Sequence, residues 1–158
     1  MKKYLEKFSV FMFGLRIYAF FSRRRTFKGF TRFLTRQAAL LNIRLNRPKP
    51  GHTPQELAER WQQLMPPDAQ DQFVISRADD HTAEVLIKIH CPLRGTGDNH
   101  ACHKLMNYDR TLMEQVGGQL IVRSSQSNSG EPHCLLAIRK AGADVGDLEP
   151  AWPGEDRP

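Results

Sequence analysis

Cysteine, histidine and aspartate side chains crowd one short stretch of the sequence. Residues 90–104 read HCPLRGTGDNHACHK and hold two cysteines, three histidines and one aspartate. Thiolates, imidazoles and carboxylates bind transition metals, and a thiolate beside a histidine can act as a nucleophile. The stretch therefore suggests a metal site or a catalytic site, and both must be weighed against a polar loop between a strand and a helix.

The three cysteines of the chain are widely spaced. Ten residues separate Cys91 from Cys102 and thirty-one separate Cys102 from Cys134, which matches no common CxxC zinc motif. All three nevertheless fall on faces expected to point inward, one from each of two hairpins and one from the helix between them. They can therefore converge on one site, or they can sit in the core as small apolar residues.

Aspartates are stronger candidates for a further ligand than the conspicuous histidines. Asp98 and Asp109 share the helical face of Cys102, whereas His103 lies about 100° away from it. Asp109 interrupts an apolar face, and a buried carboxylate needs a metal, backbone donors or a base such as Arg123 or Arg139. The candidate metal ligands are Cys91, Cys102, Cys134, Asp98, Asp109, His100 and His103.

Hydrophobic periodicity predicts the elements that position these residues. QFVIS and AEVLIKIH around RADDHT predict one hairpin, and QLIVRSS and HCLLAIRK around QSNSGEP predict a second. ACHKLMNYDRTLMEQV has the apolar period of one helix, which a glycine pair ends. Strand alternation turns His90 and His133 away from Cys91 and Cys134. The predicted fold class is α+β, with two β-hairpins forming an antiparallel sheet around a central helix, preceded by basic N-terminal helices.

Proline, glycine and charge divide the chain into three segments. NRPKPGHTP separates a basic, aromatic-rich helical segment, 1–47, from an α+β domain over 48–140. In TPQELAERWQQLMPP, Thr53 and Glu56 form a capping box and Pro66 ends the helix. Residues 141–158 are acidic and rich in proline and glycine, which predicts a disordered tail.

Residues 1–47 concentrate the positive charge. They hold twelve Lys and Arg residues against one acid, a net charge of +11, while the remainder holds eleven against sixteen, a net charge of −5. Eight of the nine phenylalanines lie there too. Periodicity predicts one helix over about 4–18 and another over about 26–43. The candidate binding residues are Arg16, the run Arg23, Arg24 and Arg25 after Ser22, and Lys28, Arg32 and Arg36.

This mixture of aromatic and basic side chains favours an anionic membrane surface or a protein complex as partner. Each base near such a membrane adds about 1 kcal/mol of attraction. Nucleic acid attracts the same charges, but no RNP or helix-turn-helix signature accompanies them. A plainer interpretation is that the helices pack on the domain or on a second protomer as a homodimer.

No transmembrane span or cleaved signal peptide is expected at the N-terminus. The apolar run Val10–Phe21 is twelve residues long and contains Arg16, whereas a spanning helix needs about twenty apolar residues. No small-residue cleavage site precedes the arginines. We therefore expect a cytoplasmic protein with reduced thiols, peripheral to the inner face of a membrane.

HCPL, ACHKLMNYD and SQSNSGEPHCLLAI together resemble a pattern found in a superfamily of small ligand- and metal-binding domains. That superfamily includes vinyl-reductase-like hydrocarbon-binding domains, methanogen output domains, 2-aminothiazoline-4-carboxylate hydrolase-like proteins and the C-terminal halves of iron–sulfur-biogenesis repressors. The resemblance covers about residues 55–140. Cys102 and Cys134 match best, and Cys91 matches the Cys-Pro type.

The resemblance implies a bound metal or small ligand. Phenol-sensing relatives hold a structural zinc, and the repressors hold an iron–sulfur cluster. This chain differs from the zinc type at Gln126, near an expected cysteine, and at Arg123, near an expected glutamate. Three thiolates with one carboxylate or histidine suit an iron–sulfur cluster or zinc. The leading hypothesis is a non-enzymatic sensory, regulatory or assembly domain that binds such a centre or a small ligand.

Two other functions stay open. The hydrolase-like relatives imply a cysteine-dependent hydrolase in which Cys91 or Cys102 pairs with a histidine. A structural interaction subunit would instead keep its cysteines inert in the core. RGTGDN could also bind a phosphate at a helix N-terminus, but this stretch has neither the third glycine of a dinucleotide-binding motif nor a P-loop lysine.

Overall fold

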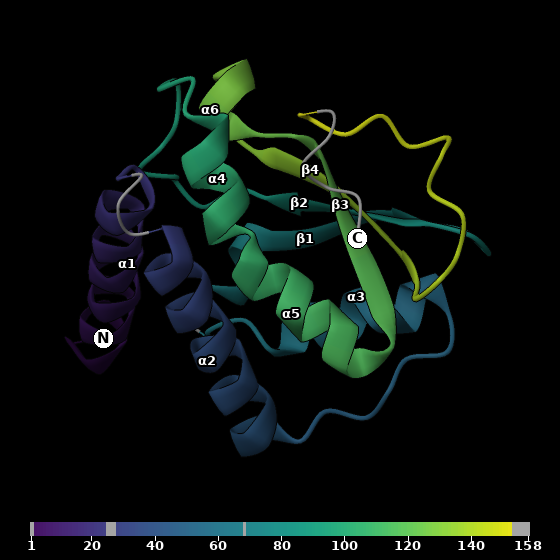
Figure 1. Cartoon of the computed structure of the whole chain (residues 1–158). Helices are drawn as coiled ribbons and strands as arrows, with labels where there is room; N and C mark the ends of the chain where they lie inside the picture. Colours follow the sequence, from purple (N-terminus) through teal and green to yellow (C-terminus); the bar gives the residue numbers. More distant parts are fainter. Residues whose placement is uncertain (1, 25–27, 68, 153–158) are drawn as a thin grey trace.

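The computed structural model describes residues 2–24, 28–67 and 69–152, with backbone alone for residues 2–11 and 28. Figure 1 shows a sheet with helices packed on one side. The helices are α1 (Lys2–Ser22), α2 (Lys28–Asn46), α3 (Pro54–Gln63), the 3-10 turn η2 (Gln70–Gln72), α4 (Asn99–Leu105), α5 (Asn107–Val116) and α6 (Gln126–Ser129). The strands are β1 (Phe73–Ala78), β2 (Ala83–Ile87), β3 (Gly118–Ser124) and β4 (Cys134–Lys140).

The four strands form one antiparallel sheet in the order β1-β2-β4-β3. The two predicted hairpins are the outer pairs, and β2 joins β4 at the centre, where Val85 pairs with Leu136. Alternate apolar side chains of these strands face the helices, because successive residues of a strand point to opposite sides. The predicted α+β class is therefore confirmed.

Helices α3 and α5 cover the inner face of the sheet, and α1 and α2 form a further layer against α4 and α5 (Figure 1). Trp61 of α3 and Leu112 of α5 are fully buried in the core. Ala19 and Ala39 of the N-terminal helices belong to that same core. The described parts of the basic segment predicted over 1–47 thus pack against the α+β domain as a further layer.

Local signals fix the ends of α3 and α5. Thr53 accepts a hydrogen bond from the Glu56 amide at 3.2 Å, as the capping box predicts, while Glu56 accepts from the His52 amide. Gly117 ends α5 in the left-handed conformation, with φ of 89°. Glycine adopts this conformation at little cost because it lacks a Cβ atom.

The central helix is broken, contrary to the single helix expected. It divides at Met106 into α4 and α5. The side-chain amide of Asn107, directly after the break, donates to the Arg32 carbonyl and the Thr35 hydroxyl of α2. These tertiary hydrogen bonds hold the second half of the helix against α2, which periodicity within one segment does not reveal.

Strand β2 is shorter than predicted and ends at Ile87. Beyond it the carbonyl of Ile89 and the amide of Cys91 bond to the side chain of Gln126 in place of a strand partner. Cys91 therefore lies in an irregular connection, not on the strand that alternation predicted. The short helix α6, within the expected hairpin loop, brings Gln126 to this position.

Residues 141–152 are packed, although the sequence predicted a disordered tail over 141–158. Leu148 covers Ile121 and Ala137 on the outer face of the sheet, and Arg139 forms two hydrogen bonds with the Asp147 carboxylate. Trp152 is buried, with 5% of its surface exposed. A few buried apolar side chains thus order a segment whose composition is typical of disordered segments. Residues 153–158 lie outside the described residues.

Within residues 2–24, 28–67 and 69–152, no helix has both the length and the apolar content needed to cross a bilayer.

Candidate functional site

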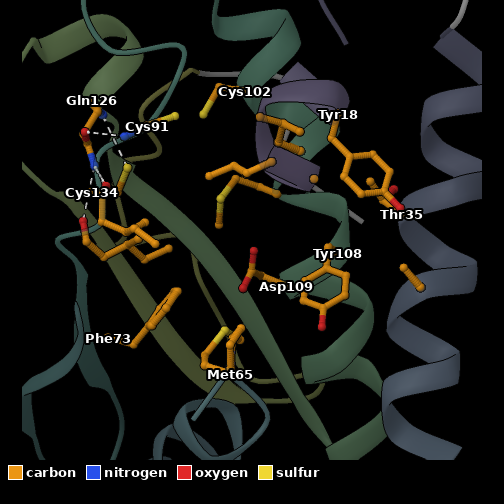
Figure 2. A pocket seen from close by; sticks show the side chains of 18 residues that line it. Tyr18, Thr35, Met65, Phe73, Cys91, Cys102, Tyr108, Asp109, Gln126 and Cys134 are labelled. Atoms are coloured by element: carbon orange, nitrogen blue, oxygen red, sulfur yellow. Dashed lines mark hydrogen bonds between the residues drawn. The ribbon is translucent and has the colours of Figure 1, made fainter. Parts of the chain in front are cut away.

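An apolar cavity of about 300 Å³ lies between the sheet, the α4–α5 pair and the N-terminal helices. Figure 2 shows the three cysteines toward one end of it, Met65 and Phe73 toward the other, and the Asp109 carboxyl group between them. Side chains from every layer contribute to its wall. The lining residues are Gly14, Leu15, Tyr18, Thr35, Ala38, Met65, Pro66, Phe73, Ile87, Ile89, Cys91, Cys102, Leu105, Met106, Tyr108, Asp109, Gln126 and Cys134.

All three cysteines line this cavity as free thiols. Cys102 comes from α4, Cys134 begins β4, and Cys91 comes from the connection between β2 and α4. Burial raises the pKa of each thiol to about 11, because a thiolate is poorly solvated among apolar groups. The structure therefore brings the three cysteines together, as protonated thiols at neutral pH.

Gln126 holds the cysteine end of the cavity in place. Its side chain accepts a hydrogen bond from the Cys91 backbone amide at 3.2 Å and donates one to the Ile89 carbonyl at 2.9 Å. The backbone amide of Gln126 donates to the Cys134 sulfur at 3.4 Å. The side chain is fully buried. Gln126 thus orders the two segments that carry Cys91 and Cys134.

A chain of hydroxyl groups extends from the third cysteine. The sulfur of Cys102 lies 3.1 Å from the Ser125 hydroxyl, which lies 2.9 Å from the Ser127 hydroxyl. Both serines are buried at the start of α6, where Ser125 also caps the helix. These contacts satisfy the hydrogen-bonding groups of all three side chains and fix the Cys102 sulfur.

Asp109 carries the one carboxyl group that the described residues contribute to the cavity wall. The indole nitrogen of Trp61 donates to its Oδ1 atom at 2.9 Å, and neither Arg123 nor Arg139 serves as its partner. Burial raises its pKa to about 6, against the lowering effects of the Trp61 hydrogen bond and the Arg110 charge.

The other predicted ligands lie elsewhere. Asp98 caps α4 by accepting from the Ala101 amide at 2.9 Å. His100 lies beside Asp98 at a separate surface hollow. The Nδ1 atom of His103 accepts hydrogen bonds from Arg110 and Trp152, because both of these groups can only donate. None of the three lines the cavity.

Three thiols and the Asp109 carboxyl group are the donors that the described cavity wall offers to a metal. Among the described residues, no group of three or more His, Cys, Asp or Glu side chains is arranged to hold a metal ion. The three cysteines nevertheless line one cavity, and the predicted zinc or iron–sulfur centre stays a prediction.

Several wall residues went unrecognised in the sequence. Gly14, Tyr18 and Thr35 were assigned only to basic helices, although they face the cavity from α1 and α2. One signal was available in the sequence: the three-residue spacing of Leu15 and Tyr18 places both side chains on the same side of the first helix. Gln126 carries no motif of its own, since its role depends on where α6 meets the end of β2.

Comparisons with protein-family models, with curated proteins and with solved structures give no significant match to this chain.

Proposed function

We propose that this protein is a non-enzymatic binding domain for a small, largely apolar molecule that carries one hydrogen-bonding group. The observation behind the proposal is the cavity of about 300 Å³, which is lined by apolar side chains and three protonated thiols. Small-molecule sites in proteins are mostly apolar cavities of about 300–1,000 Å³ with few polar groups. The cavity lies at the small end of that range, which favours a ligand of one or two rings.

Asp109 supplies the polar contact of the proposed site. Its Oδ1 atom is held by Trp61, so the carboxyl group has a fixed orientation. With a pKa of about 6, the group donates a hydrogen bond to a ligand acceptor in mildly acidic solution and accepts one from a ligand hydroxyl when ionised. A phenol-like molecule meets these requirements, because its ring suits the wall and its hydroxyl suits the carboxylate.

The cysteines contribute to the wall more readily than to catalysis. A hydrolase nucleophile needs a thiolate, which a base, a positive charge or a helix N-terminus normally stabilises. Burial instead raises the pKa of all three thiols and so disfavours the thiolate. Neutral thiols behave as small, polarisable apolar groups, which supports binding over turnover.

Titration with 1-naphthol, a two-ring phenol, tests the proposal by calorimetry. We expect one site per chain and binding at least tenfold weaker in Gly14→Leu, whose side chain would project into the cavity. Gly29→Leu is the matched control, since both glycines lie in N-terminal helices with open space around a Cβ atom but only Gly14 lines the cavity. Equal affinity in both variants, or no binding to the unaltered protein, would count against the proposal.

Convergence of three thiols on one cavity supports a second candidate, a zinc or iron–sulfur centre held by Cys91, Cys102 and Cys134. A sensory or regulatory role suits either occupant. Anaerobic purification followed by metal and sulfide analysis tests this candidate. Stoichiometric metal that is lost in Cys102→Ala would favour it, whereas folded, metal-free protein that binds 1-naphthol would favour the small ligand.

A further inference from the structure

The outer sides of α1 and α2 expose a large amount of apolar surface. Within the described part of the chain, all seven large apolar side chains that are strongly exposed lie on these two helices. Exposures range from 41% at Ile17 to 74% at Leu45. We call this set the outer face, and it consists of Phe13, Ile17, Phe20, Phe30, Phe33, Leu41 and Leu45.

The outer face extends continuously from one helix to the other. Figure 1 shows α1 and α2 side by side on the flank away from the sheet. The rings of Phe20 and Phe21 meet edge to face, and Phe21 in turn meets Phe30 of α2 with centroids 6.2 Å apart. Seven strongly exposed large apolar side chains gathered on two adjacent helices indicate an interaction site.

Arginines surround the outer face. Arg16, Arg32 and Arg44 are exposed on the same helices, and the Arg24 guanidinium lies over the Phe20 ring at 4.5 Å. Of the bases predicted for this role, Arg25 and the side chain of Lys28 lie outside the described residues. Two further bases meet acids only at 3.9 Å, Arg23 with Asp98 and Arg36 with Glu114. The positive charge is therefore largely available to a partner.

We infer that the outer face docks on an anionic lipid bilayer. Aromatic and aliphatic side chains enter the boundary between headgroups and acyl chains, while flanking arginines bind the phosphates. This occupant is favoured over a protein because the charge in residues 1–47 is almost uniformly positive, twelve bases against one acid. Anionic lipids face the cytoplasm, which agrees with the predicted cytoplasmic location.

Docking gives the N-terminal helices two functional sides. Their inner sides contribute Gly14, Tyr18 and Thr35 to the cavity wall, while their outer sides meet the bilayer. The cavity then lies one helix layer from the membrane, so molecules dissolved in the bilayer become its ligand class. This last step rests on the proposed function, whereas docking itself does not.

Co-sedimentation with vesicles tests docking on the full chain. We expect binding to phosphatidylcholine–phosphatidylglycerol vesicles (3:1), at least tenfold weaker binding to pure phosphatidylcholine, and weakening by salt. Phe13→Ser with Phe33→Ser should reduce binding at least tenfold. Arg16→Glu with Arg44→Glu should do likewise, whereas Arg77→Glu with Lys140→Glu, an equal change of charge on the exposed ends of β1 and β4, should not.

Two results would overturn the inference. One is failure of the unaltered protein to bind the anionic vesicles. The other is equal vesicle binding by the Phe13→Ser, Phe33→Ser variant, whose sites are exposed and whose fold can be checked by circular dichroism. Self-association that this variant abolishes, without vesicle binding, would assign the outer face to a second copy. Titration of the same variant with 1-naphthol keeps docking and ligand binding distinguishable, because neither phenylalanine lines the cavity.

Discussion

Trp61 of α3 donates its indole N–H to the carboxyl group of Asp109 on α5 at a distance of 2.9 Å. Both residues are buried, with 0% and 9% of their surfaces exposed. The contact orients an acidic group at the wall of an apolar cavity, where burial raises its pKa to about 6. The charge at this point of the cavity wall therefore depends on the protonation of Asp109.

The Asp109→Asn variant should lose a pH dependence of stability. The pKa of Asp109 rises from 3.8 to about 6 on folding, so the folded state binds more protons between these values. Its contribution is full below pH 4 and is lost as pH rises through 6, by about 2–3 kcal/mol in total. Urea unfolding from pH 4 to 7.5 measures this change. Asp80→Asn, in the exposed β1–β2 turn, should retain the decline, and an Asp109→Asn profile that matches the unaltered protein would contradict the account.

Gln126→Leu should destabilise the cysteine end of the cavity. The change removes the hydrogen bonds to the Cys91 amide and the Ile89 carbonyl and leaves these buried groups unpaired. We expect a loss of about 2–4 kcal/mol in the free energy of unfolding, measured in urea. Gln55→Leu, on the exposed surface of α3, should change it by less than about 0.5 kcal/mol. Similar small losses in both variants would show that Gln126 does not hold this end.

Lys104→Met should release the end of α1. The buried Lys104 ammonium donates to the Ser22 carbonyl at 2.8 Å, where the negative end of the helix dipole lies. Hydrogen–deuterium exchange should become faster in residues 12–22, with little change in β3 and β4. Lys140→Met, at an exposed position, provides the control. Unchanged exchange in α1 would mean that packing alone fixes the helix.

The thiols should react slowly with iodoacetamide at pH 7.5. A pKa of about 11 instead of 9 lowers the thiolate fraction about 100-fold, and burial restricts access further. Mass spectrometry should therefore show alkylation rising by at least that factor after unfolding in urea. Rapid modification of one cysteine in the folded protein would instead support the cysteine-dependent hydrolase.

Sequence periodicity predicted the parts of the site that depend on one element at a time. Helix and strand periodicity predicted that Cys102 and Cys134 face inward, and both line the cavity. Asp109 stands out in the sequence because it interrupts an apolar helix face. Cys91 lines the cavity too, but from an irregular connection and not from the predicted strand. The two hairpins were confirmed for the same reason, whereas the helix predicted between them is divided at Met106. Each of these inferences needs only the repeat of a strand or a helix.

The remaining features depend on contacts between elements far apart in the sequence. Gln126 replaces a strand partner for the Cys91 segment, and Asn107 binds α2 beside the break of the central helix. Leu148 finds a place on the outer face of the sheet despite its acidic surroundings. Asp98 matched the helical face of Cys102 but acts as an N-cap. The positions of these residues depend on contacts with distant parts of the chain, and a local sequence pattern does not reveal those contacts.

A crystal of the protein pressurised with xenon tests the ligand cavity most directly. Xenon enters apolar cavities and is located by its anomalous scattering. We predict xenon between Phe73, Cys102 and Asp109 in the unaltered protein and in Gly29→Leu, and its absence in Gly14→Leu. A cavity without xenon, or an anomalous peak from zinc or iron within bonding distance of the three sulfur atoms, would contradict the account.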